Sequence, residues 1–309
     1  MNRVWLWPLV VVWVGCAHEP RWPKAPRAAA PEAPPPTEAT HRPYQLIDAP
    51  TGEALDDEAF AQRLRDARLI FVGEQHDDPA HHGFQHDVLA RVHREDPSVG
   101  VAFEMLPYTL QEPLTAFAAG RLDEAAFTQA VDWEKTWGFP FGFYRPLLAF
   151  ARTHGLPAYA LNAPRTLSRK IYRGGLASLS PEEAKDLPDM EPGPGAHREF
   201  AREAYGGHGH RRFSDPAFER FYEAQLTWDE TMAAKLAAHL QGEGAPTRIV
   251  VVAGEGHTRP FAIPDRALRR GGGPVLLLLA IERADLDDAR AAQVADVLAV
   301  FEDTPPPTP

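Results

Sequence analysis

The strongest constraint on the fold is a tetrapeptide that occurs in two similar copies, each directly after a short apolar run. Gly-Glu-Gln-His at 73–76 follows the run 69–72, and Gly-Glu-Gly-His at 254–257 follows the run 249–253. Continuously apolar, β-branched runs of this length are typical of strands that are buried on both faces of a parallel sheet. Ligands of such sheets bind outside the carboxyl ends of the strands. The two tetrapeptides therefore predict one shared site at one edge of a sheet.

Two further apolar runs also end in polar residues. The run 99–103 is followed by Glu104, and the run 157–161 is followed by Asn162. Helical patterns separate the predicted strands, at 79–95, 107–119, 123–131, 144–154 and 265–270. A strand at 275–281 and a terminal helix at 285–301 complete the pattern. We predict an α/β fold with a mainly parallel central sheet flanked by helices, and a helical insertion at about 163–241.

The composition excludes several classes of function. The formal net charge is −11, from 32 basic and 43 acidic residues, and no basic stripe is present, so we expect no nucleic-acid partner. Neither of the two glycine-rich phosphate-binding motifs, GxGxxG and GxxxxGK[ST], occurs, and no serine stands in a G-x-S-x-G elbow. The single cysteine leaves no internal disulfide and argues against a catalytic thiol.

The amino-terminal segment has the pattern of an export signal. Arg3 precedes an apolar stretch at 4–14, which is too short to span a bilayer as a helix. Gly15-Cys16 resembles the end of a bacterial lipobox, so we predict a signal peptide at 1–15 and lipidation of Cys16. An ordinary signal peptide or an uncleaved anchor is the alternative. The Pro-rich segment 16–43 is then a disordered tether before a domain at 44–301, and 302–309 is a disordered tail.

The strand-end residues offer metal chemistry. Glu74, His76, Glu104 and His257 carry the carboxylates and imidazoles that bind Zn, Mn, Fe or Co ions. A hydrolytic metal site also needs a bound water and a general base, which Glu74 or Glu255 would supply. The alternative is a hydrogen-bonded polar cluster that only organises the loops.

Other side chains are candidates for supporting roles. His82 lies in the helix predicted at 79–95, near the carboxyl edge of the sheet, and Asn162 and Arg165 should line the same cleft. Inside the insertion, a Gly/His-rich turn runs from Tyr205 to His210. Tyr and His are axial ligands of haem iron, although a Gly-rich turn is equally typical of a loop between helices.

The order of the motifs resembles that of the ChaN family of bacterial haem-binding lipoproteins. That family belongs to a superfamily with the Tiki-type metalloproteases and the erythromycin esterases. The matching stretches cover nearly the whole globular part, at 71–82, 101–105, 137–146, 160–165, 221–225, 229–233 and 253–257.

The resemblance implies a lipid-anchored protein of the bacterial cell envelope, at the outer membrane and facing the periplasm or the surface. It implies haem or iron uptake, with haem held between two protomers of a homodimer. A tyrosine of the helical part would bind the iron, and Tyr205 is our choice, with His208 and His210 nearby. The Gly-x-x-His turns match metal-binding motifs of the Tiki proteases. A divalent-metal-dependent hydrolase, either a peptidase or an esterase, therefore stays open as the alternative.

Overall fold

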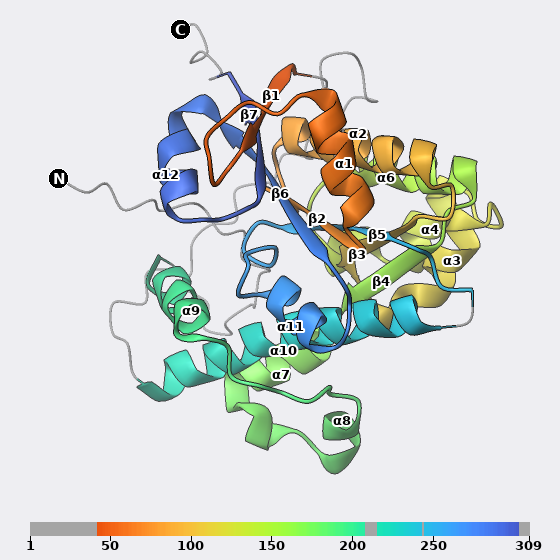
Figure 1. The fold of residues 1–309 in the computed structure, drawn as a ribbon. Coiled ribbons are helices and arrows are strands. Elements are labelled where there is room, and N and C mark those ends of the chain that lie inside the picture. The colour runs from red at the N-terminus through yellow and green to blue at the C-terminus, as the bar shows by residue number, and fades with distance from the viewer. Residues whose placement is uncertain (1–41, 208–214, 243, 303–309) are drawn as a thin grey trace, which may run out of the picture.

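A seven-stranded sheet forms the centre of the protein (Figure 1). The structure is a computed structural model and describes residues 42–207, 215–242 and 244–302. The strand order is β1-β7-β6-β2-β5-β3-β4. Only β1 pairs antiparallel, with β7, and all the other pairs are parallel. The predicted α/β class with a mainly parallel sheet is confirmed. The strands are β1 (Tyr44–Asp48), β2 (Leu69–Glu74), β3 (Gly100–Pro107), β4 (Ala158–Asn162), β5 (Ile249–Gly254), β6 (Val275–Glu282) and β7 (Val297–Phe301).

The two central strands are those that carry the similar tetrapeptides. Every residue of β2 and of β5 is buried, as the continuous apolar runs predicted. The two strands pair in parallel from Leu69 beside Ile249 to Glu74 beside Gly254. The register therefore places the two Gly-Glu turns side by side at one edge of the sheet.

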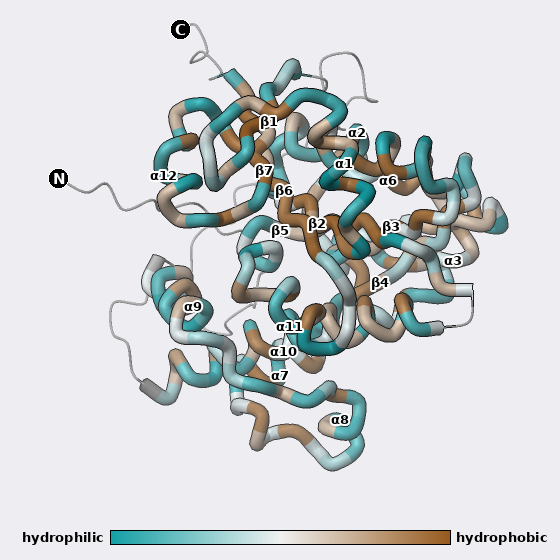
Figure 2. Tube along the Cα trace, in the orientation of Figure 1, coloured by the Kyte–Doolittle hydropathy of each residue, from teal (hydrophilic) through white to brown (hydrophobic). Residues whose placement is uncertain are grey.

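Helices cover both faces of this sheet, and Figure 2 shows the apolar strands enclosed between them. On one face, Ile70 and Val72 pack against side chains of α1, α2 and α6. On the other face, Leu69 and Phe71 pack against α10 and α11. The helices on the first face are α1 (Asp57–Asp66), α2 (Pro79–Glu95), α3 (Gln111–Ala118), α4 (Glu124–Ala130), α5 (Trp133–Thr136) and α6 (Phe141–His154), and those on the second include α10 (Asp215–Gln241) and α11 (Ile263–Arg269).

Local sequence signals fix several helix ends. The Asp56 side chain caps α1 by accepting a hydrogen bond from the backbone N–H of Ala59. Asp78 caps α2 in the same manner, and Pro79 occupies the first turn, where its missing N–H costs nothing. These caps hold α2 directly after the first tetrapeptide, and so bring His82 to the carboxyl edge of the sheet.

The segment 163–241 contains α7 (Arg165–Gly174), α8 (Pro181–Lys185) and α9 (Gly195–Gly207), followed by the long α10. Figure 1 shows α7 and α8 on the side of α10 away from the sheet, and α9 beside the left end of α10. Because α10 itself contacts β4 and α11, it joins these helices to the α/β core.

The expected terminal helix at 285–301 is wrong. The chain forms only a short helix, α12 (Leu286–Ala291), and then enters strand β7. The apolar run from Val297 to Phe301 is fully buried between β6 and β1. Strand pairing prevails here because both neighbouring strands offer backbone groups that a helix would leave unpaired. Strand β1 was not expected from the sequence.

Several predictions concern residues that lie outside the described part of the chain. They are the signal peptide at 1–15, Cys16, most of the tether, His208, His210 and the tail. Within residues 42–207, 215–242 and 244–302, no helix is long and apolar enough to cross a membrane.

Candidate functional site

The carboxyl edge of the sheet brings the strand-end residues of β2, β3 and β5 together. The backbone N–H of Gly254 donates to Glu104 Oε2 at 2.7 Å, and the N–H of Glu255 donates to the carbonyl of Glu74 at 2.9 Å. These two bonds continue the sheet beyond its last paired residues. They hold the carboxylate of Glu104 at the turn that carries His257.

Glu74 is the centre of a closed, buried cluster. Its side chain is fully buried, and Oε1 accepts hydrogen bonds from Tyr144 Oη and His76 Nδ1, each at 2.7 Å. Oε2 lies 3.1 Å from His82 Nδ1. Burial alone would raise the pKa of Glu74, but His82 and His76 hold it well below its usual range. Glu74 is therefore a structural anion: Oε1 accepts two hydrogen bonds, whereas Oε2 is paired with His82 by charge and accepts no hydrogen bond.

His82 faces acceptors through both ring nitrogens. Nε2 lies 3.2 Å from the carbonyl of His76, and Nδ1 lies 3.1 Å from Gln85 Oε1 as well as from Glu74. Gln85 must present its oxygen here, because its amide nitrogen donates to the carbonyl of Val72 at 3.1 Å. Burial lowers the pKa of His82, but Glu74 outweighs burial and the net shift is upward. A protonated His82 thus completes the cluster.

His257 belongs to a second cluster, on the other side of Gly254. Its Nδ1 lies 2.6 Å from Asp229 Oδ1, and its Nε2 lies 3.6 Å from Glu104 Oε1. The side chain is 18% exposed, twice the 9% of His76. Burial opposes protonation, yet Glu104 and Asp229 together raise the pKa of His257 to about 9. This imidazole is the more accessible of the two.

The missing side chain of Gly254 lets the two clusters meet. A Cβ added there would lie 2.8 Å from His76 Cε1, 3.0 Å from His76 Nε2 and 3.5 Å from Glu104 Oε2. Both groups therefore crowd around the same backbone position. On its other side, the His76 ring packs edge-on against Trp137, with centroids 4.7 Å apart. The structure thus brings Glu74, His76, Glu104 and His257 into one place.

The sequence profile of the family described as haem-binding uptake, Tiki superfamily, ChaN matches residues 60–266. This match covers the sheet edge, both clusters and the helical segment. The chain belongs to this ChaN family.

Solved structures support the fold of a ChaN-family protein. ChaN of Campylobacter jejuni, described for its cofacial haem binding, is 19% identical, with a TM-score of 0.66 over 84% of this chain and 97% of that one. An erythromycin esterase mutant in its open conformation is 10% identical and covers 77% of this chain and 76% of that one, with a TM-score of 0.46. The first likeness shows a shared fold, and the second is too weak to carry an argument.

A plant protein is also similar in sequence. The chloroplastic protein RETICULATA-RELATED 5 of Arabidopsis thaliana is 25% identical over 277 residues, which are 82% of this chain. The ChaN-family chain spans only 36% of that relative's length.

Asn162 and Arg165, which were predicted to line the cleft, donate hydrogen bonds to backbone carbonyls rather than to the carboxylates of the site. Asn162 Nδ2 donates to the carbonyl of Glu104 at 3.0 Å. Arg165 donates to the carbonyls of Lys135 and Thr136, the latter at 3.3 Å. Asn162 thus positions Glu104, and Arg165 holds the segment that leads into Trp137.

Glu255, the other candidate base, is paired with an arginine rather than with His257. Its nearest charged partner is Arg259, with Oε2 and Nη2 3.8 Å apart. Burial raises the pKa of Glu255 above its usual range, against the opposing effect of Arg259. The two tetrapeptide glutamates therefore have opposite environments.

The candidate haem ligand Tyr205 lies in α9, apart from these clusters. Its side chain is 4% exposed and packs against Phe218 and Phe221 of α10, with ring centroids 5.8 and 5.2 Å apart. His208 and His210 lie in a segment that the structure does not describe.

Sequence reasoning missed four residues of the site. Tyr144 lies on α6, Asp229 on α10, His197 on α9 and Arg266 on α11, and all four are buried. Each is far in sequence from its partner, so no local spacing marks it. Tyr144 and Asp229 do fall inside stretches that carry the family resemblance, which was the available signal.

The ion-binding capacity of the site is limited as it stands. Among the residues that the structure describes, no group of three or more His, Cys, Asp or Glu side chains is arranged to hold a metal ion. The carboxylates are instead bonded to tyrosine, histidine and backbone groups.

Proposed function

We propose that this ChaN-family protein binds haem and serves haem or iron uptake as a lipid-anchored protein of the bacterial cell envelope. The observation that carries the proposal is the family match over residues 60–266. It is supported by the shared fold with Campylobacter jejuni ChaN, whose description names cofacial haem binding.

The helical part offers the groups that haem requires. A haem site needs an iron ligand, apolar faces against the macrocycle and cations near the propionates. Tyr205 supplies a phenol, and it shares a buried aromatic cluster with Phe218, Phe221 and Tyr222. Arg202 lies over the Phe218 ring at 4.5 Å, and Arg198 lies over the Tyr222 ring at 4.9 Å.

This donor set fits haem in its chemistry, with one condition. Tyr205 is buried against α10, so iron ligation requires its side chain to turn away from Phe218 and Phe221. Haem shared by two protomers would cover the face that this movement exposes. We therefore propose a haem-linked homodimer, with His208 and His210 near the iron.

Titration of the purified protein with hemin tests this site. We expect a Soret shift in the wild type that is weakened or moved in Tyr205→Phe. The matched control is Tyr172→Phe, a partly buried tyrosine that packs against the same Phe221 ring at 6.4 Å. An unshifted spectrum in the wild type would exclude haem binding, and identical spectra in the two variants would exclude Tyr205 as ligand. Sedimentation with and without hemin measures the proposed dimer.

The anchor is tested separately from the haem site. We propose that Cys16 is lipidated after removal of residues 1–15 and that 16–43 tethers the domain to the outer membrane. Labelling with a fatty-acid probe should mark the wild type but not Cys16→Ser, and the variant should leave the membrane fraction. Labelling of both proteins would show that any lipid is attached at a residue other than Cys16.

A divalent-metal-dependent hydrolase is the second candidate, and one observation favours it. His76 and His257 each turn Nδ1 toward a carboxylate, Glu74 and Asp229 respectively. This leaves the Nε2 atoms near Gly254 and Glu104, and an imidazole oriented by a carboxylate is the usual form of a metal-binding histidine. A Mn, Co, Zn or Fe ion would take His76, His257 and Glu104 as ligands, and would supply a polarised water.

Neither Glu74 nor Glu255 is well placed to act as the general base of such a hydrolase. Glu74 is buried and ion-paired with two histidines, and Tyr144 donates to its Oε1, whereas Glu255 is near Arg259. Metal analysis of the purified protein and of His257→Ala tests this candidate. Stoichiometric metal that is lost in the variant supports it, and a metal-free wild type excludes it.

A further inference from the structure

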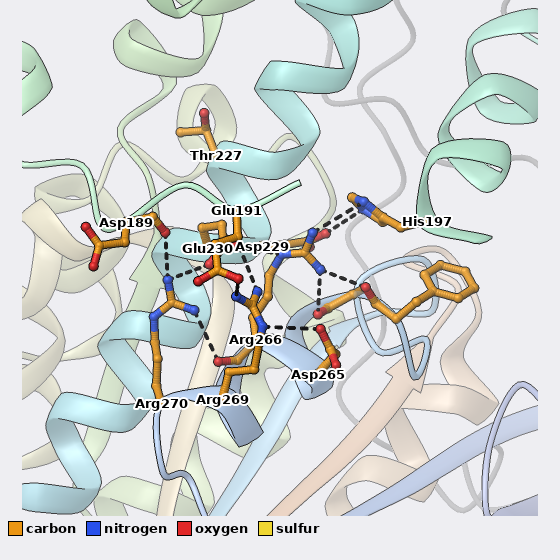
Figure 3. Close-up of polar contacts among 12 residues, drawn as sticks. Asp189, Glu191, His197, Thr227, Asp229, Glu230, Asp265, Arg266, Arg269 and Arg270 are labelled. Atoms are coloured by element: carbon orange, nitrogen blue, oxygen red, sulfur yellow. Dashed lines mark hydrogen bonds and ion pairs between the residues drawn. The ribbon is translucent and has the colours of Figure 1, made fainter. Parts of the chain in front are cut away.

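Arg266 of α11 is completely buried, at 0% exposure, and it contacts Glu230 and His197 (Figure 3). Its Nε lies 3.1 Å from Glu230 Oε1, which Arg269 Nη2 also approaches at 3.0 Å. Arg270 Nη2 lies 2.5 Å from the other oxygen of Glu230. A buried guanidinium must be paired, and Glu230 of α10 provides the pairing.

The two terminal nitrogens of Arg266 make different contacts. Nη1 donates to the carbonyls of Phe261 and Ala262, at 2.7 and 3.0 Å, and so ties down the loop that follows β5. Nη2 lies 3.3 Å from His197 Nδ1. The same Nδ1 also lies 3.2 Å from Tyr222 Oη, which can donate as well as accept. Because a guanidinium has only donors, Nδ1 of His197 presents its lone pair to Arg266, and the ring carries its proton on Nε2.

This protonation state determines the next contact. His197 Nε2 lies 3.0 Å from Asp229 Oδ2, so His197 donates a hydrogen bond to that oxygen. The other oxygen of Asp229 lies 2.6 Å from His257 Nδ1. With His197 donating to Oδ2, the carboxylate of Asp229 acts as acceptor on both oxygens, so His257 carries a proton on Nδ1.

We propose that Arg266 and His197 are positioning residues that act through Asp229 to hold the His257 ring with Nε2 facing Glu104. The two nitrogens of a histidine are distinct, and only the one that faces the site can bind an ion or exchange a proton with a ligand. The relevance to catalysis rests on the hydrolase candidate above, whereas the ring orientation itself does not depend on it.

A purely structural role for the same residues makes a different prediction. If His197 only fills space between α9 and α10, then any residue of similar volume should replace it. If it acts as a donor to Asp229, then glutamine, which keeps a side-chain N–H, should replace it better than phenylalanine, which keeps only the ring.

Proton NMR of the full chain separates these roles. The short Nδ1–H bond from His257 to Asp229 should give a downfield imidazole N–H resonance, assigned by its loss in His257→Gln. We expect His197→Gln to retain it. In His197→Phe we expect an upfield shift and exchange with water about tenfold faster, because one supporting hydrogen bond is lost. The variant Arg266→Met, in which Glu230 keeps Arg269 and Arg270 as ion-pair partners, should behave like His197→Phe.

Each other outcome overturns the proposal. A resonance that is absent in the wild type, or unchanged in His197→Phe, would show that His257 is not held in this manner. Equal changes in His197→Gln and His197→Phe would show a packing role only. Circular dichroism checks the fold, and if Arg266→Met does not fold, the two His197 variants decide the question alone. The NMR readout requires neither metal nor hydrolysis, so it is independent of the success of the hydrolase candidate.

Discussion

The two Gly-Glu-x-His tetrapeptides lie side by side, yet they produce opposite environments. The turn after β2 is closed, because Glu74 is bonded to Tyr144, His76 and His82. In the turn after β5, the ion-pair partner of Glu255 is Arg259 and not a histidine, and His257 stays partly exposed. The elements packed around each turn account for the difference: α2 and α6 enclose the first turn, whereas α10 and α11 leave His257 accessible. Similar sequences therefore supply a buried support in one copy and a partly exposed imidazole in the other.

The largest expected effect separates the two glutamates. Glu74→Gln removes a buried anion and leaves His82 without its compensating charge, so we expect a loss of about 3–5 kcal/mol in the free energy of unfolding. Glu255→Gln is the matched control. Burial already favours the neutral form of Glu255, so its replacement should cost about 1 kcal/mol or less. Urea unfolding measures both, and equal losses would show that the two turns do not differ in this way.

The pH dependence of stability tests the second cluster. The pKa of His257 is raised from 6.5 to about 9 in the folded protein, so its protonated form favours folding. That contribution is complete below about pH 6.5 and is lost as the pH rises through about 9. We expect the wild type to lose about 3 kcal/mol over this window. His257→Gln should lose much less, and parallel pH profiles for the two proteins would contradict the assigned charge.

The smallest effect concerns the boundary between the clusters. In Gly254→Ala, the new Cβ would lie 2.8 Å from His76 Cε1, so the imidazole must shift. We expect a loss of about 2 kcal/mol in the free energy of unfolding, together with a moved His76 resonance in NMR spectra. Gly242→Ala is the control, because its Cβ would meet only a backbone oxygen at 3.7 Å. If both variants unfold at the same urea concentration, the clusters are not in contact at Gly254.

The sheet edge could be predicted from sequence because its physical signals are local. The runs 69–72 and 249–253 are too continuously apolar for a half-exposed strand, and parallel strands end at a common edge. The segment 285–301 shows the limit of this reasoning. Its apolar residues suit either a helix or a strand, and only the neighbouring β1 and β6 decide for β7.

The supporting side chains of the site could not be predicted in the same way. Asp229 lies within the long helix α10, and Arg266 lies in α11, where a charged residue ordinarily faces solvent. Their roles arise from how α9, α10 and α11 meet, which is a property of tertiary packing. Glu74 and Glu255 make the same point, since similar local sequences acquire opposite pKa shifts from different neighbours.

The most direct test of the proposed function is what the native protein carries when it is purified from the cells that make it. A visible absorption spectrum and an elemental analysis of the same sample would be recorded together. A haem-binding ChaN-family protein should show a Soret band, with iron and porphyrin in equal amounts. A colourless protein that takes up no added hemin would contradict the proposal, and stoichiometric Mn, Co or Zn in that sample would favour the hydrolase instead.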